Sequence, residues 1–228
     1  MPPDPVFFKC VTDLLEGIEI RTSPESLRRR RPGKIRPVQS SAQITNECVE
    51  TWFDTYREDI ARQPRTLLAI LSTLLPDNRP DRVYEIKEDR LAKILNAVLG
   101  TAGTRREADI LGWRLSPEGN LPDVVERIMK AAVMSKGCTV SIETFDDVMD
   151  RLAARSQFSS KEIQDLQKSE SKDEIADLLR PLYTKFEAVE AKWATRIILR
   201  NIAPVVLGGM LFQSTLFLQS TLFDADRR

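Results

Sequence analysis

The stretch KWATRIILRNIAPVV, residues 192–206, combines a short amphipathic helix with an Ala-Pro stop. Trp193 and Ile197 are one helical turn apart, so we expect them to face a protein core. Pro204 has no N–H group to continue the helical hydrogen-bond ladder, so the helix must end before it. The stretch therefore predicts a helix with one buried side and a defined end.

The same helical spacing of apolar residues recurs along almost the whole sequence. Alternation with a period of two, flanked by Asn-Gly or Asp-Gly turn pairs, is missing, which argues against a sheet of any size. We therefore predict an all-α fold, a multi-helix globular bundle. The apolar stripes begin at Phe7, Val49, Leu67, Leu91, Val124, Phe145 and Ile175.

Serine-rich punctuation predicts two helix starts. The segments SSKE, residues 159–162, and SKDE, residues 171–174, both fit the capping box, in which a serine and a glutamate three residues later satisfy free backbone N–H groups. Pro181 falls inside an apolar stripe, so we expect it to kink or end that helix.

Composition excludes several classes of chemistry. The 228 residues include 34 Lys and Arg, 34 Asp and Glu, and no histidine, which removes Ser-His-Asp triads, Cys-His pairs and histidine-containing zinc sites. A Gly-rich phosphate loop, a Rossmann fingerprint and a Lys-x-Asp-Gly motif are also missing. We predict no catalytic residue, no metal ligand and no cofactor in this sequence, and therefore a binding domain.

Smaller features receive structural interpretations. The acids Glu143, Asp146, Asp147 and Asp150 are read as the wet face of a helix rather than a magnesium site. The cysteines Cys10, Cys48 and Cys138 are odd in number and widely spaced, which is typical of reduced, buried thiols in cytosol or nucleus. The proline-rich start, residues 1–5, does not resemble a secretory signal.

Two segments break the helical pattern. Residues 21–36 carry seven basic residues against the single acid Glu25, which predicts a solvated loop or arm over residues 21–37. Such a run also suits a nuclear address or a phosphate-attracting arm.

Residues 201–223 hold no charge and contain the pentad QSTLF twice, at 213–217 and 219–223. Polar residues spread around this tail make a membrane span unlikely, and a poorly packed apolar end is the preferred interpretation.

Two places have the residues needed to bind phosphate. The predicted helix start at Ser171 and Lys172, preceded by Lys168, offers free N–H groups beside lysines, although a plain capped surface helix is the preferred interpretation of these residues alone. In the opening stretch, helical spacing puts three cations on one stripe that we expect to be exposed, next to Asn201. These cations are Lys192, Arg196 and Arg200.

The order of several motifs resembles the helical N-terminal DNA-binding domain of eukaryotic ATP-dependent DNA ligases, most like the ligase IV group of non-homologous end joining. The segment RVYEIKE, residues 82–88, followed by LAKIL, residues 91–95, is similar to that family's Tyr-Gly-Ile-Lys-Glu and Leu-Ala-Lys motifs. Residues 171–179 resemble its Ser-x-Lys helix start, and residues 190–201 its Lys-Trp tract with a basic helix end. The likeness runs from about residue 7 to residue 207.

The resemblance implies a domain that holds duplex DNA around a nick or break, in the minor groove, without reading sequence. It implies DNA binding over residues 1–207, with residues 208–228 as a divergent apolar tail, and a nuclear role in DNA repair, ligation and recombination. Other end-joining proteins are implied as further partners, and a membrane is not. The implied DNA-binding residues are Lys168, Ser171, Lys172, Lys192, Arg196, Arg200 and Asn201.

The sequence departs from the family pattern in three ways. Glu85 and Pro122 replace glycines, and Pro204 stands where a glycine usually follows the basic helix end. The nucleotidyltransferase domain, which uses ATP and magnesium in the family, does not follow residue 207 here, so we expect this chain not to seal nicks alone. A helical protein-interaction scaffold, or a relative that no longer binds DNA, is the alternative hypothesis.

Overall fold

The all-α prediction is confirmed by the computed structural model, which describes residues 4–29, 39–61, 63–132, 139–168 and 174–207. Within these residues the chain forms eleven α-helices, two short 3-10 helices and no strand. The helices are α1 (Lys9–Thr22), α2 (Pro24–Arg29), α3 (Ser41–Ala61), α4 (Pro64–Leu74), η1 (Pro76–Asn78), α5 (Glu88–Val98), α6 (Arg105–Leu111), η2 (Trp113–Leu115), α7 (Leu121–Lys130), α8 (Ile142–Ala153), α9 (Lys161–Lys168), α10 (Ile175–Tyr183) and α11 (Ala188–Ile198).

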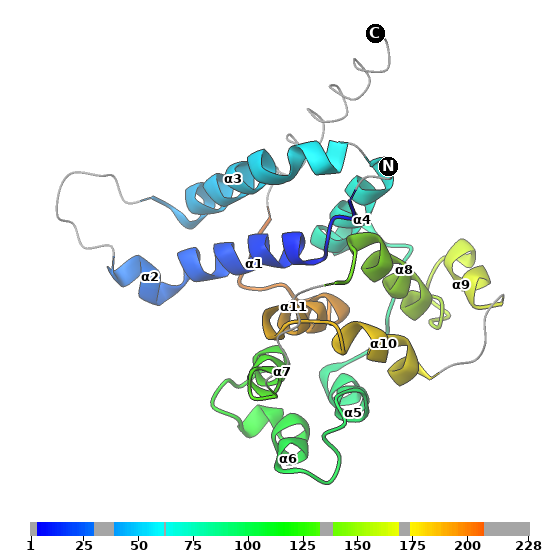
Figure 1. Cartoon of the computed structure of the whole chain (residues 1–228). Helices are drawn as coiled ribbons and strands as arrows, with labels where there is room; N and C mark the ends of the chain where they lie inside the picture. The colour runs from blue at the N-terminus through cyan, green and yellow to red at the C-terminus, as the bar shows by residue number, and fades with distance from the viewer. Residues whose placement is uncertain (1–3, 30–38, 62, 133–138, 169–173, 208–228) are drawn as a thin grey trace.

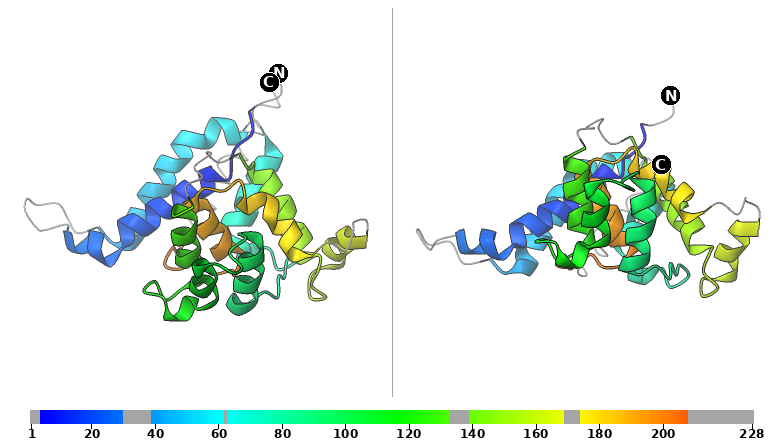
Figure 2. Two further views of the ribbon diagram at one scale, coloured as in Figure 1. Left: turned by 60° about the horizontal axis from the view of Figure 1, so that its bottom comes forward. Right: turned by 90° about the horizontal axis from the view of Figure 1, so that it is seen from below.

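The other helices are arranged around α11. Long helices α1 and α3 run side by side on one side of it, α8 and α10 lie on another, and α5, α6 and α7 form the lower part of the molecule (Figure 1). Seen from below, α5 and α7 lie in front of α11, which is visible between them (Figure 2). All residues of α11 from Glu190 to Ile198 are buried.

One continuous apolar core joins nearly all these helices. It is built largely from the predicted stripes, but Phe8 is buried in place of the predicted Phe7, which is exposed. Phe8 stacks on Phe145 with ring centroids 4.1 Å apart, and Phe186 lies beside them. The backbone on each side of Phe7 pairs with the segment that leads into α8, through Phe8 N to Val140 O and Ile142 N to Val6 O. The start of the chain is thereby fixed against α8.

Local details correct some sequence expectations. In the first predicted capping box, the serine next to α9 is Ser160, whose hydroxyl accepts from Ile163 N, while the Ser159 hydroxyl is used elsewhere. Glu174, predicted inside a helix, is the N-cap of α10. The capping box that the structure does form joins Glu187 and Glu190 at the start of α11. Pro181 lies inside α10 and does not end it directly, because the helix continues to Tyr183.

Several predictions concern residues that the structure describes only in part. The basic segment 21–37 is helical as far as Arg29, in α1 and α2, so the loop prediction is wrong for that part, and residues 30–38 lie outside the described residues. Cys10 and Cys48 are buried and not joined in a disulfide, whereas Cys138 and the tail from residue 208 lie outside the described residues. No helix in the described part of the chain is long and apolar enough to cross a membrane.

Candidate nucleic-acid interface

The predicted exposed stripe of cations on α11 is wrong for two of its three members. The side chains of Lys192 and Arg196 are only 4% and 8% exposed. Because α11 is covered on all sides by its neighbours, its charged residues lie inside the protein together with Trp193. They face acids from α1 and α7 rather than solvent.

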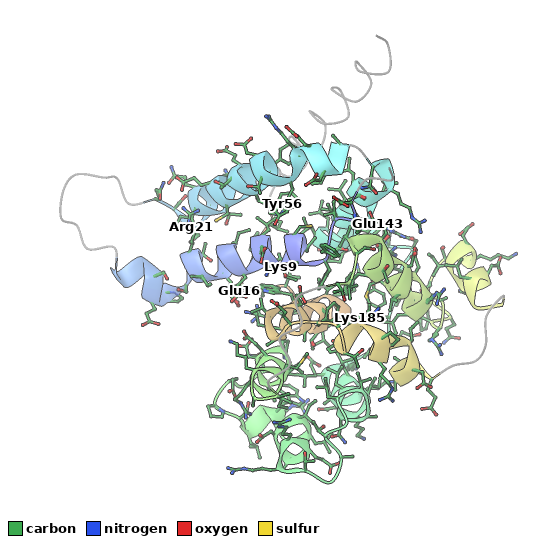
Figure 3. The ribbon with its side chains drawn as sticks, in the orientation of Figure 1. Lys9, Glu16, Arg21, Tyr56, Glu143 and Lys185 are labelled. Carbon is green, nitrogen blue, oxygen red and sulfur yellow. The ribbon has the colours of Figure 1, made fainter. Side chains whose placement is uncertain are left out.

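These buried cations form ion pairs with several carboxylates. Lys192 Nζ donates to Glu16 and, over 2.8 Å, to Glu19, both on α1. Arg196 donates to Glu19 over 2.6 Å and to Asp123 of α7 over 3.1 Å. The indole N–H of Trp193 also donates to Glu16, which lies on the side of α1 nearest α11 (Figure 3).

The pairing changes the acid–base behaviour of Lys192. Burial alone would lower the pKa of its ammonium group, but hydrogen bonds to Glu16 and Glu19 outweigh burial and raise the pKa. The lysine therefore stays charged inside the protein, and its charge is already matched by carboxylates. A buried, paired cation of this kind holds α1 and α11 together and has no surface to offer a phosphate.

Arg200 ends α11 in a Schellman motif. Asn201 N donates to Arg196 O and Arg200 N to Ile197 O, both over 2.9 Å, and Arg200 has a left-handed φ of 53°. Glycine usually occupies this position because it has no side chain to clash there. Arginine is used here, and its guanidinium donates to Arg82 O over 2.8 Å and to Pro76 O.

A second residue with a left-handed backbone lies close to Arg200. Glu85 has a φ of 50°, and Glu85 and Arg200 are the left-handed non-glycine residues of the described chain. Both line one open hollow of about 310 Å³, formed by residues 83–87 and 198–200. Backbone strain of this type tends to cluster at functional sites, which directs attention to this hollow.

The segment 83–87 is held against the end of α8. Val83 N donates to the hydroxyl of Ser159, which in turn donates to Ala153 O. Ser156 donates to the carboxylate of Glu85 over 2.6 Å. This explains the role of Ser159 that the capping-box interpretation missed: the serine anchors a chain segment rather than a helix start.

Unpaired cations follow the hollow along α5. Lys87 lies at the N-cap of α5 and lines the hollow, and Arg90 and Lys93 lie on the exposed side of the helix. In the part of the chain that the structure describes, none of the three forms an ion pair. The start of α5 also presents backbone N–H groups, since the side chain of Lys87 does not cap it. Sequence reasoning missed this patch, although Lys87 and Lys93 lie in the two segments, residues 82–88 and 91–95, that carry the family resemblance.

The acids near this patch are partly neutralised. Asp89, in the first turn of α5, pairs with Arg114, and that hydrogen bond lowers the pKa of its carboxyl. Glu85 forms no ion pair within the described residues. Lys87, Arg90 and Lys93 are therefore exposed and without an ion pair, and two carboxylates that also form no ion pair within the described residues, Glu85 and Glu88, lie beside them.

Residues 119–122, where Pro122 replaces a glycine of the family pattern, lead into α7 near the C-terminal end of α11. Gly119 has a left-handed φ of 66°, and the side-chain oxygen of Asn120 accepts from Asp123 N over 3.0 Å, capping α7. Pro122 is buried in the first turn of α7, where a helix needs no N–H donor from it. Because Asp123 binds Arg196, the start of α7 is held next to the end of α11.

The remaining predicted binding residues are separated from this group or not described. Lys168 is the last residue of α9, and nothing is described of its side chain; Ser171 and Lys172 lie outside the described residues. Asn201 is exposed at the end of α11, and its side-chain oxygen accepts from Ala203 N over 3.2 Å.

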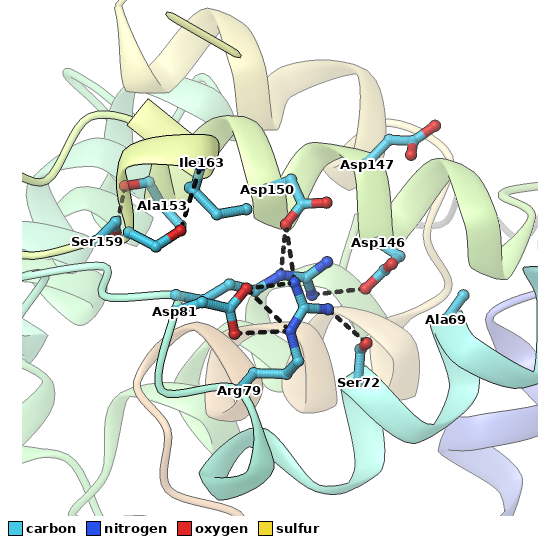
Figure 4. A network of polar contacts seen from close by, with 12 residues as sticks. Ala69, Ser72, Arg79, Asp81, Asp146, Asp147, Asp150, Ala153, Ser159 and Ile163 are labelled. Atoms are coloured by element: carbon cyan, nitrogen blue, oxygen red, sulfur yellow. Dashed lines mark hydrogen bonds and ion pairs between the residues drawn. The ribbon is translucent and has the colours of Figure 1, made fainter. Parts of the chain in front are cut away.

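The acids of α8 form a solvated face only in part, because Asp147 is exposed and pairs with the exposed Arg65, whereas Asp146 and Asp150 turn toward the protein. Asp146 and Asp150 both bind Arg82, whose side chain is 2% exposed, and Arg79 joins Asp81, Asp150 and Ser72 (Figure 4). Among the described residues no group of acids or cysteines is arranged to hold a metal ion. The network instead fixes the segment after η1, from which residues 83–87 emerge.

Comparison with known proteins identifies the family of this chain. Two curated proteins named DNA ligase 4, both from Coprinopsis cinerea, are each 27% identical to this chain over 167 residues. The match covers 68% of this chain and 14% of the relative, so the chain spans a small part of its relatives' length. Residues 8–213 match the family described as DNA ligase N terminus. Since this match includes most of the sequence, the chain belongs to the DNA ligase N-terminal domain family.

Proposed function

We propose that this chain is a sequence-independent DNA-binding module of the ligase type. Its family membership supports a ligase-related role, and the exposed cations of α5 beside the strained hollow supply the chemistry. Phosphate contacts fix a protein on a duplex without reading bases, so such a surface binds unrelated sequences equally. The observation that carries the proposal is that Lys87, Arg90 and Lys93 are exposed and form no ion pair within the described residues, whereas Lys192 and Arg196 of α11 are buried in ion pairs.

The binding surface in this proposal has two kinds of residue. Lys87, Arg90 and Lys93 contact phosphates, together with backbone N–H groups at the start of α5 and with Asn201. Lys168, Ser171 and Lys172 remain proposed contacts on the basis of the sequence. Lys192, Arg196 and Arg200 act as positioning residues, because their cationic groups bind acids and carbonyl oxygens within the fold.

The wider role is DNA repair in the nucleus, by end joining, ligation and recombination. The relative's name, DNA ligase 4, supports a place in DNA ligation. The chain would hold nicked or broken duplex while a nucleotidyltransferase domain, using ATP and magnesium, performs the chemistry. In this role the chain supplies affinity and geometry only.

A binding titration of the whole chain tests the proposal. Fluorescence anisotropy with nicked, intact and single-stranded DNA of two unrelated sequences should show equal binding to both sequences and a steep fall with salt. The triple variant Lys87→Ala, Arg90→Ala, Lys93→Ala should bind at least about tenfold more weakly, with a shallower salt slope.

The matched control removes a cation from another part of the surface. Arg57 is exposed on α3, at the opposite end of the molecule from α5 (Figure 1), so Arg57→Ala should leave DNA binding unchanged. If the triple variant binds as tightly as the unaltered chain, the α5 surface is not the DNA site. If the unaltered chain binds none of the probes, the proposed function is wrong.

A helical protein-interaction scaffold is the second candidate. It is favoured by exposed apolar side chains, since Leu115 is 94% exposed and Phe158 is 64% exposed. Exposed apolar residues that cluster are typical of protein contacts, whereas scattered ones are ordinary. Direct binding of a purified end-joining protein, lost in Leu115→Ser or Phe158→Ser while no DNA probe binds, would favour this candidate.

A further inference from the structure

The backbone at Glu85 is unusual for its residue type. Its φ of 50° lies in the left-handed region, which glycine adopts readily and a glutamate adopts at a cost. Nothing in the core requires a carboxylate here, since the residue is exposed. Glu85 is therefore an exposed glutamate in a strained conformation beside the proposed phosphate site. We look for its role in the negative charge of its carboxylate.

The carboxylate is also held in place. Ser156, which is 3% exposed, donates to Glu85 Oε2 over 2.6 Å, and the same hydroxyl accepts from Phe158 N over 3.1 Å. A buried serine that is fixed by its own backbone contact limits how far the carboxylate can swing away. The negative charge of Glu85 therefore stays near the hollow that Lys87 and Arg200 also line.

Nothing in the described part of the chain neutralises this charge by an ion pair. The hollow encloses about 310 Å³, so a phosphate bound by Lys87 lies within a Debye length of the Glu85 carboxylate at moderate salt. Two negative charges at such a separation repel each other measurably. The carboxylate works against the cations that share its site.

We propose that Glu85 is an affinity-limiting residue, which weakens the hold of this surface on DNA phosphates and speeds release of the bound duplex. The proposal rests on the proposed function, because it concerns the same surface. A repulsive charge next to a cationic site raises the dissociation rate without changing which sequences are bound.

The variant Glu85→Gln isolates the charge. Glutamine has nearly the same shape and retains a side-chain oxygen to accept from Ser156, so backbone and anchoring are preserved. We expect this variant to bind nicked duplex at least about threefold more tightly than the unaltered chain at low salt, from the Coulomb energy over several ångströms. The gain should shrink as salt rises, because screening weakens the repulsion.

A second variant and a control complete the experiment. Glu85→Lys should strengthen binding further and make the salt dependence steeper by about one counterion. Glu50→Gln removes the same charge from the exposed side of α3 and should leave affinity unchanged. The thermal midpoint of Glu85→Gln should match that of the unaltered chain, which separates an effect on binding from an effect on folding.

The outcomes distinguish this inference from the proposed function. Equal, salt-dependent binding by the unaltered chain and by Glu85→Gln overturns the inference and leaves DNA binding intact. Salt-dependent binding by the unaltered chain, with tighter binding by Glu85→Gln, supports both. Failure of the unaltered chain and of both Glu85 variants to bind overturns both.

Discussion

Arg196 on α11 lies 3.1 Å from the carboxylate of Asp123 on α7, inside the protein. The same guanidinium binds Glu19 of α1 and stacks over the ring of Trp193, 4.7 Å from its centroid. One side chain thereby joins three helices that are far apart in the sequence. Arg196 therefore has a structural role in the fold, and its buried guanidinium does not form part of a binding surface.

Replacing Arg196 by methionine should destabilise the fold strongly. The variant keeps most of the side-chain length but removes the guanidinium. Asp123 then has lost its ion pair with Arg196, and Glu19 keeps only its ion pair with Lys192. Breaking a buried pair by removing one member costs about 3–5 kcal/mol. Urea unfolding followed by tryptophan fluorescence measures this loss.

The matched control for this prediction is Arg57→Met on the exposed side of α3. A surface substitution without an ion pair should change the free energy of unfolding by less than about 0.5 kcal/mol. If both variants lose the same small amount, the buried network contributes little to stability.

Arg200 allows backbone and side-chain effects to be separated. Arg200→Ala removes the hydrogen bonds to Arg82 O and Pro76 O and keeps a side chain at a φ of 53°. We expect a loss of about 1–3 kcal/mol. Arg200→Gly loses the same contacts but suits the left-handed backbone, so it should be about 1 kcal/mol more stable than the alanine variant. Equal stability of the two variants in urea would show that the left-handed position carries no strain.

Helical spacing predicted the fold class because apolar stripes depend only on local periodicity. Phe145 and Phe186 meet in one core, as their stripes imply, but their partner from the start of the chain is Phe8, whereas Phe7, with which the predicted stripe began, is 41% exposed. α11 ends before Pro204, as predicted, but the Schellman motif at Arg200 rather than the proline ends it, at Ile198.

The candidate site was predicted less well, for a physical reason. Lys192 and Arg196 have the spacing of an exposed stripe, but spacing does not reveal partners supplied from other helices. Glu16 and Glu19, three residues apart on α1, are the partners, and acids at that spacing occur on many solvated helices. Lys192 and Arg196 can be buried because they pair with acids that are distant in sequence. These pairs follow from the tertiary arrangement of α1 and α11.

Two glycines should respond in opposite ways to alanine. A Cβ on Gly112 would lie 2.7 Å from Ala108 O, a backbone atom, so Gly112→Ala should destabilise the turn after α6 by about 1–3 kcal/mol. Gly17 lies within α1 and a Cβ there would meet nothing within 4 Å, so Gly17→Ala should stabilise the fold by about 0.5–1 kcal/mol. Thermal unfolding of the two variants should shift the midpoint in opposite directions. A shift in the same direction for both would contradict the local geometry of at least one of them.

All three tyrosines should titrate abnormally in the folded protein. Burial raises the pKa of Tyr56, Tyr84 and Tyr183 above the ordinary value of 10.0. A raised folded pKa means that the neutral phenol stabilises the fold below about pH 10, and that this contribution is lost as pH rises through the folded pKa.

Near-ultraviolet absorbance should therefore show less phenolate at pH 10 in buffer than in concentrated urea, where the chain is unfolded. Tyr183→Phe should reduce the difference, because its hydroxyl is fully enclosed and bonded to Thr195 over 2.9 Å. Identical titration curves in buffer and urea would show that the three phenols are accessible to water in the folded chain.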